Sequence, residues 1–124
     1  MTNSKTILIT GSNRGIGLEL VKESLTKNFS VVGTFRNKNN AKELLKLKSN
    51  NLKLFEMDVV KENSILNVSN NIDYTIDYLI CNAGINNGYG GIFDQDHSYE
   101  KMLEVLNVNV LGCILTIKHF TRNL

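Results

Sequence analysis

The sequence predicts an α/β domain built on a parallel β-sheet. Three observations predict it. Short apolar runs alternate with segments of helical periodicity, a glycine-rich turn joins the first run to the first helical segment, and 124 residues fit one domain. Strands that alternate with helices favour parallel pairing with right-handed crossovers. No internal repeat, low-complexity segment or interdomain linker breaks the pattern, so residues 1–124 are expected to form a single unit.

The first half of the chain is expected to contain two strands and two helices. Residues 6–10 are a nearly continuous apolar run, which is typical of a strand buried on both faces. A helix follows the glycine-rich turn as far as about residue 28, residues 30–35 form the second strand, and residues 41–48 form the second helix. The apolar sides of these helices are assigned to Ile16, Leu20, Val21 and Leu25 in the first, and to Leu44, Leu45 and Leu47 in the second.

The second half continues the alternation. Residues 52–58 are expected to form the third strand, residues 64–72 the third helix, and residues 77–81 the fourth strand. Ser98 is expected to cap a last helix that runs beyond Leu115. Between the fourth strand and that helix a mobile loop over residues 85–97 is indicated by Gly88, Gly90 and Gly91.

Composition argues against several classes of function. A net charge of +2 with scattered lysines favours neither nucleic acid nor a membrane surface as a partner, and no uninterrupted apolar run approaches the ~20 residues of a membrane span. Cys81 and Cys113 form no Cys-x-x-Cys pair, and His97 and His119 belong to no ligand cluster, so no metal site is expected. The cysteines are interpreted as small buried hydrophobes in a reducing compartment. Because no signal-peptide pattern begins the chain, a cytoplasmic location is expected.

The glycine-rich turn is the first candidate site. Gly11, Gly15 and Gly17 follow a predicted strand and open a predicted helix, which is the context that a dinucleotide site requires. Gly11 permits a tight turn, Gly15 lets a pyrophosphate approach the backbone, and Gly17 lets the helix pack closely on the sheet. Free amides near Gly15 and Ile16 would then face the phosphates. The alternative is a tight strand-to-helix connection that binds nothing.

Residues 10–17 read Thr-Gly-x-x-x-Gly-Ile-Gly, and this string resembles the nucleotide-binding signature of the short-chain dehydrogenases/reductases. Three further matches follow in the order that this family has them. Asp58 ends the third strand, Asn82-Ala83-Gly84 follows the fourth, and Asn109 precedes Gly112 by three residues in the last helix. The resemblance covers essentially the whole chain, but only about the first half of a typical family member.

The resemblance implies the first half of a Rossmann-type doubly wound sheet, with strand order 3-2-1-4 and the succession β-α-β-α-β-α-β-α. It also implies that Asn109 belongs to a catalytic tetrad with a Ser, a Tyr and a Lys. Cys81 departs from the pattern, because the family usually has an Asn there, and one hydrogen-bonding side chain is thereby removed. The implied cofactor-binding residues are Gly11, Ser12, Asn13, Arg14, Gly15, Ile16, Gly17, Arg36, Asp58, Val59, Asn82, Ala83 and Gly84. Asp58 could instead be a plain turn residue, and residues 82–84 a plain strand end.

The end of the second strand favours NADP over NAD as the cofactor. An acidic residue about 20 residues beyond the last glycine would hydrogen-bond the free ribose hydroxyls of NAD. Arg36 stands there instead, and its planar guanidinium can bind a 2′-phosphate through two hydrogen bonds. Arg14, inside the glycine-rich turn, can reach the same phosphate, and basic residues at both positions resemble those of NADP-preferring family members. The alternative is that both arginines are solvated surface charges.

The catalytic segment that the resemblance calls for is not found in the sequence. Family chemistry uses Tyr-x-x-x-Lys, and none of Tyr74, Tyr78, Tyr89 and Tyr99 has a lysine four residues later. We therefore expect a dinucleotide-binding domain, truncated before the Ser, Tyr and Lys positions and inactive as an isolated chain, since general acid catalysis contributes ~10²–10⁴-fold.

Three functions stay open on these grounds. The first is the NADP(H)-binding part of an oxidoreductase that acts on a small carbonyl or alcohol substrate when completed by a second half. The second is a catalytically silent dinucleotide-binding or regulatory protein, and the third is a fold remnant without a ligand. A Rossmann-like methyltransferase fits less well, because it would normally carry an acidic residue where Arg36 stands. In each case the last helix is expected to expose an apolar face through which a homo-oligomer could form.

Overall fold

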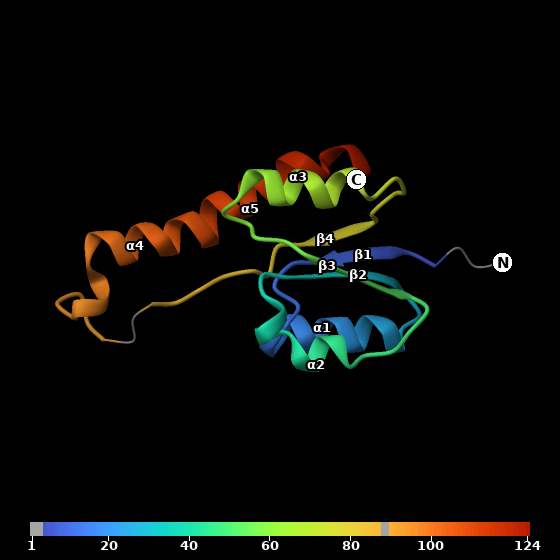
Figure 1. Ribbon diagram of the computed structural model, residues 1–124, viewed down its shortest axis with the longest axis horizontal. Helices are drawn as coiled ribbons and strands as arrows, with labels where there is room; N and C mark the ends of the chain where they lie inside the picture. The colour runs from blue at the N-terminus through green and yellow to red at the C-terminus, as the bar shows by residue number, and fades with distance from the viewer. Residues whose placement is uncertain (1–3, 88–89) are drawn as a thin grey trace.

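A four-stranded parallel sheet forms the centre of the computed structural model, which describes residues 4–87 and 90–124 (Figure 1). The strands are β1 (Thr6–Ile9), β2 (Ser30–Phe35), β3 (Leu52–Glu56) and β4 (Tyr78–Ile80). Their order across the sheet is β3-β2-β1-β4, and every pairing is parallel. The Rossmann-type arrangement expected from the sequence is therefore confirmed, with β1 between β2 and β4.

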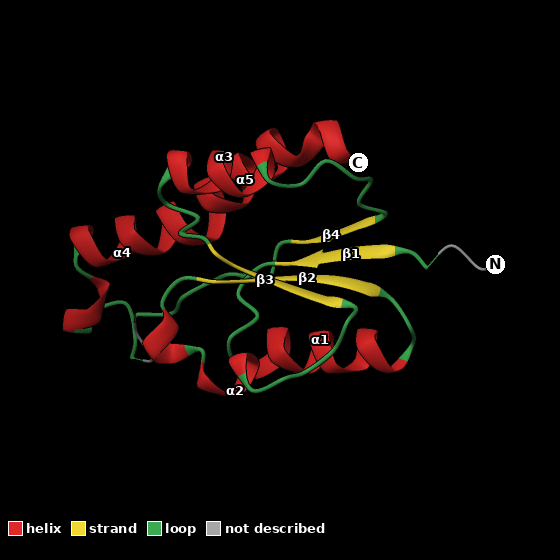
Figure 2. Ribbon diagram, turned by 45° about the vertical axis from the view of Figure 1, so that its right-hand side comes forward, coloured by secondary structure: helices red, strands yellow, loops and turns green. Residues whose placement is uncertain are grey.

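Helices cover both faces of the sheet (Figure 2). The helices α1 (Gly15–Thr26) and α2 (Lys42–Leu45) lie on one face, whereas α3 (Glu62–Asn70) and α5 (Gly112–Phe120) lie on the other. Successive side chains of β1 point to opposite faces of the sheet, so this strand contributes to the hydrophobic core on both faces. Ile7 and Ile9 join the core under α1, and Leu8 joins the core under α3. This alternation explains why the first strand reads as an apolar run.

Two helices differ from the sequence expectation on the α1 side of the sheet. The helix α2 has four residues instead of the eight expected over 41–48, and a 3₁₀ turn (Lys38–Asn40) precedes it. Ala41 and Leu44 are fully buried, whereas Leu45 is exposed, so only one turn of this segment gains free energy by packing. In α1 the apolar side is rotated from the one expected, because Ile16 is 75% exposed and Gly17 faces the sheet instead.

The last helix contains an irregular turn that the sequence did not predict. It consists of α4 (Tyr99–Leu106), a π-helical turn (Asn107–Leu111) and α5, and α4 projects beyond the sheet (Figure 1). The predicted cap is confirmed, because the Ser98 hydroxyl accepts a hydrogen bond from the Lys101 amide at 3.3 Å. The loop expected over residues 85–97 contains a 3₁₀ turn (Gln95–His97), and its Gly88 lies outside the described residues.

Length and composition alone would allow the helical segment Tyr99–Asn123 to cross a membrane. No such span was expected from the sequence, because charged residues at the start of the segment interrupt the apolar run. One such helix is weak evidence for a membrane span, since core helices of soluble proteins pass the same test. In this fold Thr116 and Phe120 of α5 are buried.

Candidate cofactor site

An open cleft of about 550 Å³ lies where the carboxyl ends of the strands meet the start of α1. Ligands of open parallel sheets bind at this edge, beside the point where the strand order reverses. The sequence-derived cofactor residues that line the cleft are Gly11, Asn13, Arg14, Gly15, Ile16, Arg36, Asp58, Val59, Asn82, Ala83 and Gly84. The other two, Ser12 and Gly17, are buried and do not line it.

The glycine-rich turn has the backbone conformation that its glycines allow. Gly11 and Gly15 have φ values of +65° and +55°, in the left-handed region that other residues adopt at a cost. A Cβ atom on Gly11 would stand 2.8 Å from the Ala83 Cα, and one on Gly17 would collide with the Gly11 carbonyl oxygen. A Cβ on Gly15 would meet nothing within 4 Å. Gly11 and Gly17 thus close the turn, while Gly15 leaves its open side accessible to a phosphate.

The start of α1 offers unused hydrogen-bond donors to the cleft. Arg14 occupies the cap position and its side chain makes no capping hydrogen bond. The first amides of a helix have no partner within the helix, and their dipoles favour an anion. Because Gly15 and Ile16 line the cleft, these donors border the space that a pyrophosphate would need.

A threonine that the sequence analysis left out of the site joins the two walls of the cleft. The buried Thr10 hydroxyl accepts hydrogen bonds from the amides of Asn82 and Ala83, both at 3.0 Å. The Asn82 side chain in turn donates to the Gly11 carbonyl oxygen at 3.0 Å. The segment after β4 is therefore attached directly to the glycine-rich turn. Thr10 belongs to the sequence motif, and its position there is the signal that could have identified it.

Arg14 and Arg36 line the same cleft and are both exposed. Within residues 4–87 and 90–124 neither guanidinium has a hydrogen-bond or ion-pair partner. The segments that carry them are joined by Asn13, whose amide donates to the Asn40 carbonyl oxygen at 3.1 Å. Two unpaired cations beside a cleft fit an anionic ligand. The cleft residues that the sequence analysis missed are Thr34, Asn37, Asn40, Met57, Ile85 and Val108.

Asp58 both organises a turn and borders the cleft. Its Oδ1 accepts a hydrogen bond from the Val60 amide at 3.1 Å, and its own amide donates to the Ser64 hydroxyl at 2.9 Å. The Asp58 side chain is 20% exposed, and the Lys61 ammonium lies 3.9 Å from its Oδ2. Val59 is buried beside it. Asp58 is thus a turn residue, which was the alternative interpretation, and it also lines the cleft.

The Asn109 side chain is hydrogen-bonded to the backbone of the segment that leaves the cleft. It lies in the π-helical turn, where its Oδ1 accepts from the Ile85 amide at 2.8 Å and its Nδ2 donates to the Ile85 carbonyl oxygen at 2.9 Å. A Cβ on Gly84 would stand 3.2 Å from the Asn109 Oδ1. The Asn109 side chain therefore does not line the cleft but positions the residues that do. The nearby Asn107 has no such partners in the described part of the chain.

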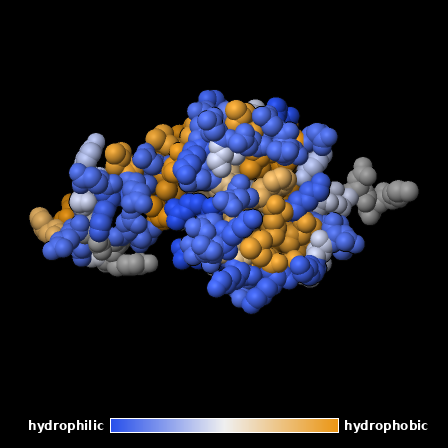
Figure 3. Space-filling view, in the orientation of Figure 1, coloured by the Kyte–Doolittle hydropathy of each residue, from blue (hydrophilic) through white to orange (hydrophobic). Residues whose placement is uncertain are grey.

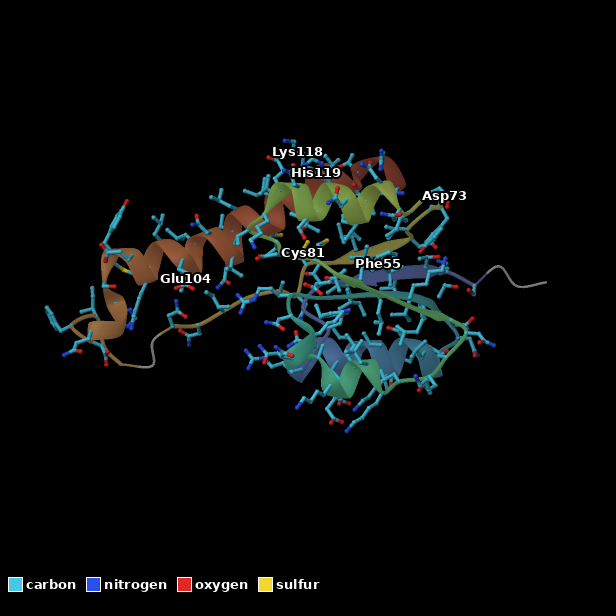
Figure 4. All side chains as sticks on the ribbon, viewed as in Figure 1. Phe55, Asp73, Cys81, Glu104, Lys118 and His119 are labelled. Carbon is cyan, nitrogen blue, oxygen red and sulfur yellow. The ribbon has the colours of Figure 1, made fainter. Side chains whose placement is uncertain are left out.

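Cys81 lies between the end of β4 and the α3–α5 layer, as its label in Figure 4 shows. Burial and a hydrogen bond with Cys113 raise the pKa of the Cys81 thiol to about 12. Cys81 is therefore a neutral thiol at physiological pH. Across the described ranges, no group of three or more His, Cys, Asp and Glu side chains is gathered closely enough to hold a metal ion.

Comparison with known proteins agrees with this geometry. The family model for short chain dehydrogenases matches residues 5–124. The chain is 31% identical over 104 residues to the 3-oxoacyl-[acyl-carrier-protein] reductase FabG of Buchnera aphidicola, covering 82% of this chain and 43% of that protein. It is 30% identical to estradiol 17-beta-dehydrogenase 1 of Rattus norvegicus, covering 95% of this chain and 36% of that protein.

Solved structures show the same fold. ElxO with NADP bound superposes with a TM-score of 0.82 at 27% identity, over 96% of this chain and 50% of ElxO. The 3-ketoacyl-(acyl-carrier-protein) reductase of Brucella melitensis, complexed with NADH, gives a TM-score of 0.83 at 23% identity, over 96% of this chain and 49% of that protein. The chain thus spans about half of the length of these proteins or less. With the family model matched along nearly all of its length, this chain belongs to the short-chain dehydrogenase family.

Proposed function

We propose that this chain is the NADP(H)-binding part of an enzyme that transfers hydride between nicotinamide and a carbonyl or alcohol substrate. The observation that carries the proposal is one cleft that combines an uncapped helix start with two unpaired arginines. The amides of Gly15 and Ile16 would bind the pyrophosphate, and Arg14 and Arg36 would bind the 2′-phosphate. NAD is the less favoured cofactor, because no carboxylate of β2 is available to its ribose.

The other cleft residues have separate roles in this proposal. Asp58 and Val59 would contact the adenine, and residues 82–84 would line the ribose and nicotinamide side. Asn109 would take the Asn position of the catalytic tetrad, where the geometry supports a positioning role through Ile85. Nicotinamide would supply the hydride, and the Tyr that donates the proton, together with the Lys that lowers its pKa, would come from outside these 124 residues. The isolated chain is therefore proposed to bind the cofactor without turning over substrate.

The preference for NADP is tested by Arg36→Asp. Replacing the guanidinium by a carboxylate removes charged hydrogen bonds to the 2′-phosphate and adds repulsion, so a wild-type preference of about a hundredfold for NADPH should reverse. The measurement is the ratio of the NADPH and NADH dissociation constants, from fluorescence titrations of both proteins at fixed salt. Lys48→Asp is the matched control, because it makes the same change of charge at an exposed site outside the cleft. An unchanged ratio in Arg36→Asp would refute the assignment.

A second candidate is a catalytically silent dinucleotide-binding or regulatory protein, which the same cleft with its two unpaired arginines would serve equally well. Both candidates bind NADPH, so binding alone does not separate them. Reading the coding DNA beyond Leu124 does: a downstream Tyr-x-x-x-Lys supports the enzyme, and a stop codon without one supports the silent protein. Failure to bind either dinucleotide would leave only a fold remnant.

We further propose a cytoplasmic protein that associates through its last helix and binds neither nucleic acid nor a membrane. The exposed apolar residues of this helix support association: Tyr99, Met102, Leu103, Leu106, Val110, Leu111, Ile114 and Ile117. The weak net charge of +2 supports the absence of a nucleic-acid partner.

A further inference from the structure

Gly112 is a buried glycine at the start of α5, three residues after Asn109. It lies inside a continuous helical segment, because the π-helical turn ends at Leu111 and α5 begins directly after it. Glycine is a poor helix former, so helix formation alone does not favour it at this position. Its neighbours in space show what a larger residue would disturb.

The residue packed against Gly112 is Val59. A Cβ atom on Gly112 would stand 2.7 Å from the Val59 Cγ2, 3.0 Å from its Cβ and 3.3 Å from its carbonyl oxygen. Both carbon–carbon distances are shorter than the about 3.5–4.0 Å of an optimal contact. Rotation of the Val59 side chain would relieve only the first of them, and β-branched side chains are stiff about that bond. A side chain at position 112 would therefore move the backbone of Val59 or the helix itself.

Val59 lies between Gly112 and the cofactor cleft, since Val59 lines the cleft and Gly112 does not. The turn that carries Val59 is held by its own hydrogen bonds. The Lys61 amide donates to the Asp58 carbonyl oxygen at 3.0 Å, and the Asp58 amide donates to the Ser64 hydroxyl at 2.9 Å. A displacement of Val59 would therefore carry Asp58 with it and change the shape of this wall of the cleft.

We propose that Gly112 is a positioning residue, which sets the adenine side of the cofactor cleft through its contact with Val59. Three residues earlier, Asn109 holds Ile85 at the other wall of the cleft by two hydrogen bonds. The helix thus fixes both walls from within one turn. The inference rests on the proposed function, because it takes residues 58 and 59 as the contacts of the adenine.

The test is a double-mutant cycle of Gly112→Ala and Val59→Ala. Calorimetry measures the dissociation constant of adenosine 2′,5′-bisphosphate, which carries the adenine and the 2′-phosphate without nicotinamide, well below the Tm of each variant. Gly112→Ala should weaken binding about tenfold in the wild-type chain, and by less than about threefold in Val59→Ala, where the nearest atom has been removed. Gly91→Ala is the control and should leave the constant unchanged, because a Cβ there meets nothing within 4 Å.

The inference is overturned if Gly112→Ala has no effect on affinity or the same effect in both backgrounds, since a purely structural role lowers Tm without changing the affinity of the folded protein. The proposed function survives that result as long as the wild type binds NADPH. A wild type that binds neither NADPH nor the bisphosphate overturns both. If Gly112→Ala does not fold, the double variant decides. Folding with an affinity close to that of Val59→Ala supports the inference, and failure on either count overturns it.

Discussion

Gly17 is the residue on which the shape of the glycine-rich turn depends most directly. A side chain there would meet two groups of the site at once, the Gly11 carbonyl oxygen and the Asn82 Nδ2, the latter at 2.5 Å. These two groups are hydrogen-bonded to each other at 3.0 Å, so neither can move away without breaking that bond. One missing methyl group therefore allows the start of α1 to rest against the turn.

Gly17→Ala should destabilise the fold by about 1–3 kcal/mol, because the added methyl group overpacks a rigid site. It should also weaken NADPH binding, since the helix start would be displaced from the cleft. Urea unfolding and a fluorescence titration measure the two effects. Gly91→Ala is the control, because a Cβ at Gly91 meets nothing within 4 Å. Equal stability of the two variants would show that the turn is more adaptable than its contacts indicate.

The sequence predicted those cleft residues that belong to a local motif or stand at a fixed spacing from one. The glycines and Arg14 follow from one motif, and Arg36 follows from its distance to that motif. Asn40 could not be identified in this way, because only its carbonyl oxygen contacts Asn13, and any residue could supply that oxygen. The exposure of Ile16 was missed for a related reason. Periodicity assigns apolar residues to the core, whereas in α1 the residue against the sheet is Gly17 rather than Ile16, although Val21 is buried as expected.

Among the elements, the π-helical turn has the most specific task. It contributes Asn109, whose side chain makes two hydrogen bonds to Ile85. Asn109→Ala should cost about 1 kcal/mol of stability and speed hydrogen exchange of the Ile85 amide. Asn107→Ala, in the same turn, is the control and should change neither quantity. If both variants exchange at the wild-type rate, the proposed positioning role of Asn109 is wrong.

The contact between α3 and α5 has a pH-dependent component. The Glu62 Oε1 accepts hydrogen bonds from Lys118 at 2.7 Å and from His119 at 2.8 Å. These bonds lower the pKa of Glu62 below 4.5, so its stabilising contribution is complete above that value. The contribution is lost as the pH falls through the lowered pKa.

Glu62→Gln should therefore unfold at lower urea concentration than the wild type at pH 7. The difference should shrink as the pH falls below about 4.5, where the wild type also loses this charge. Urea midpoints across this range measure it. Glu19→Gln is the control, because within the described residues Glu19 pairs with Lys22 alone, on the exposed side of α1. A difference that persists undiminished at low pH would mean that Glu62 acts through its shape rather than its charge.

Elements with strong periodicity were predicted well, and those shaped by packing were not. The bounds of β2 agree with the expected residues 30–35, because turn residues limit an apolar run on both sides. In α2 no turn residue marks the end of the helix. Ala41 and Leu44 are buried and Leu45 is exposed, and this packing is not visible in the sequence. The π-helical turn has no signature in the sequence, since it depends on Asn109 reaching a segment that lies elsewhere in the chain.

At the scale of the whole molecule, the uneven distribution of apolar surface is the main feature. The exposed apolar residues of the last helix recur at spacings of three and four, from α4 through the π turn into α5. Figure 3 shows apolar surface between the body of the domain and the projecting helix. Such a stripe favours association with another surface.

The proposed association is tested by the double variant Leu106→Lys and Ile114→Lys. Two charges in the middle of the stripe should oppose its burial, so the variant should sediment as a monomer at concentrations where the wild type forms larger species. Sedimentation velocity over a range of concentrations measures this. Leu45→Lys, at an exposed apolar residue of α2, is the control. A wild type that is monomeric at every concentration would contradict the proposal.

The central position of β1 has a consequence for how the protein is made. Of the four strands, β1 is synthesised first. Its neighbours in the sheet are β2 and β4, which are synthesised later and lie on opposite sides of β1. The nascent sheet must therefore grow outward from its oldest strand, towards β3 on one side before β4 arrives on the other. A deletion of β1 would remove the partner of two strands, whereas a deletion of β3 would remove the partner of one.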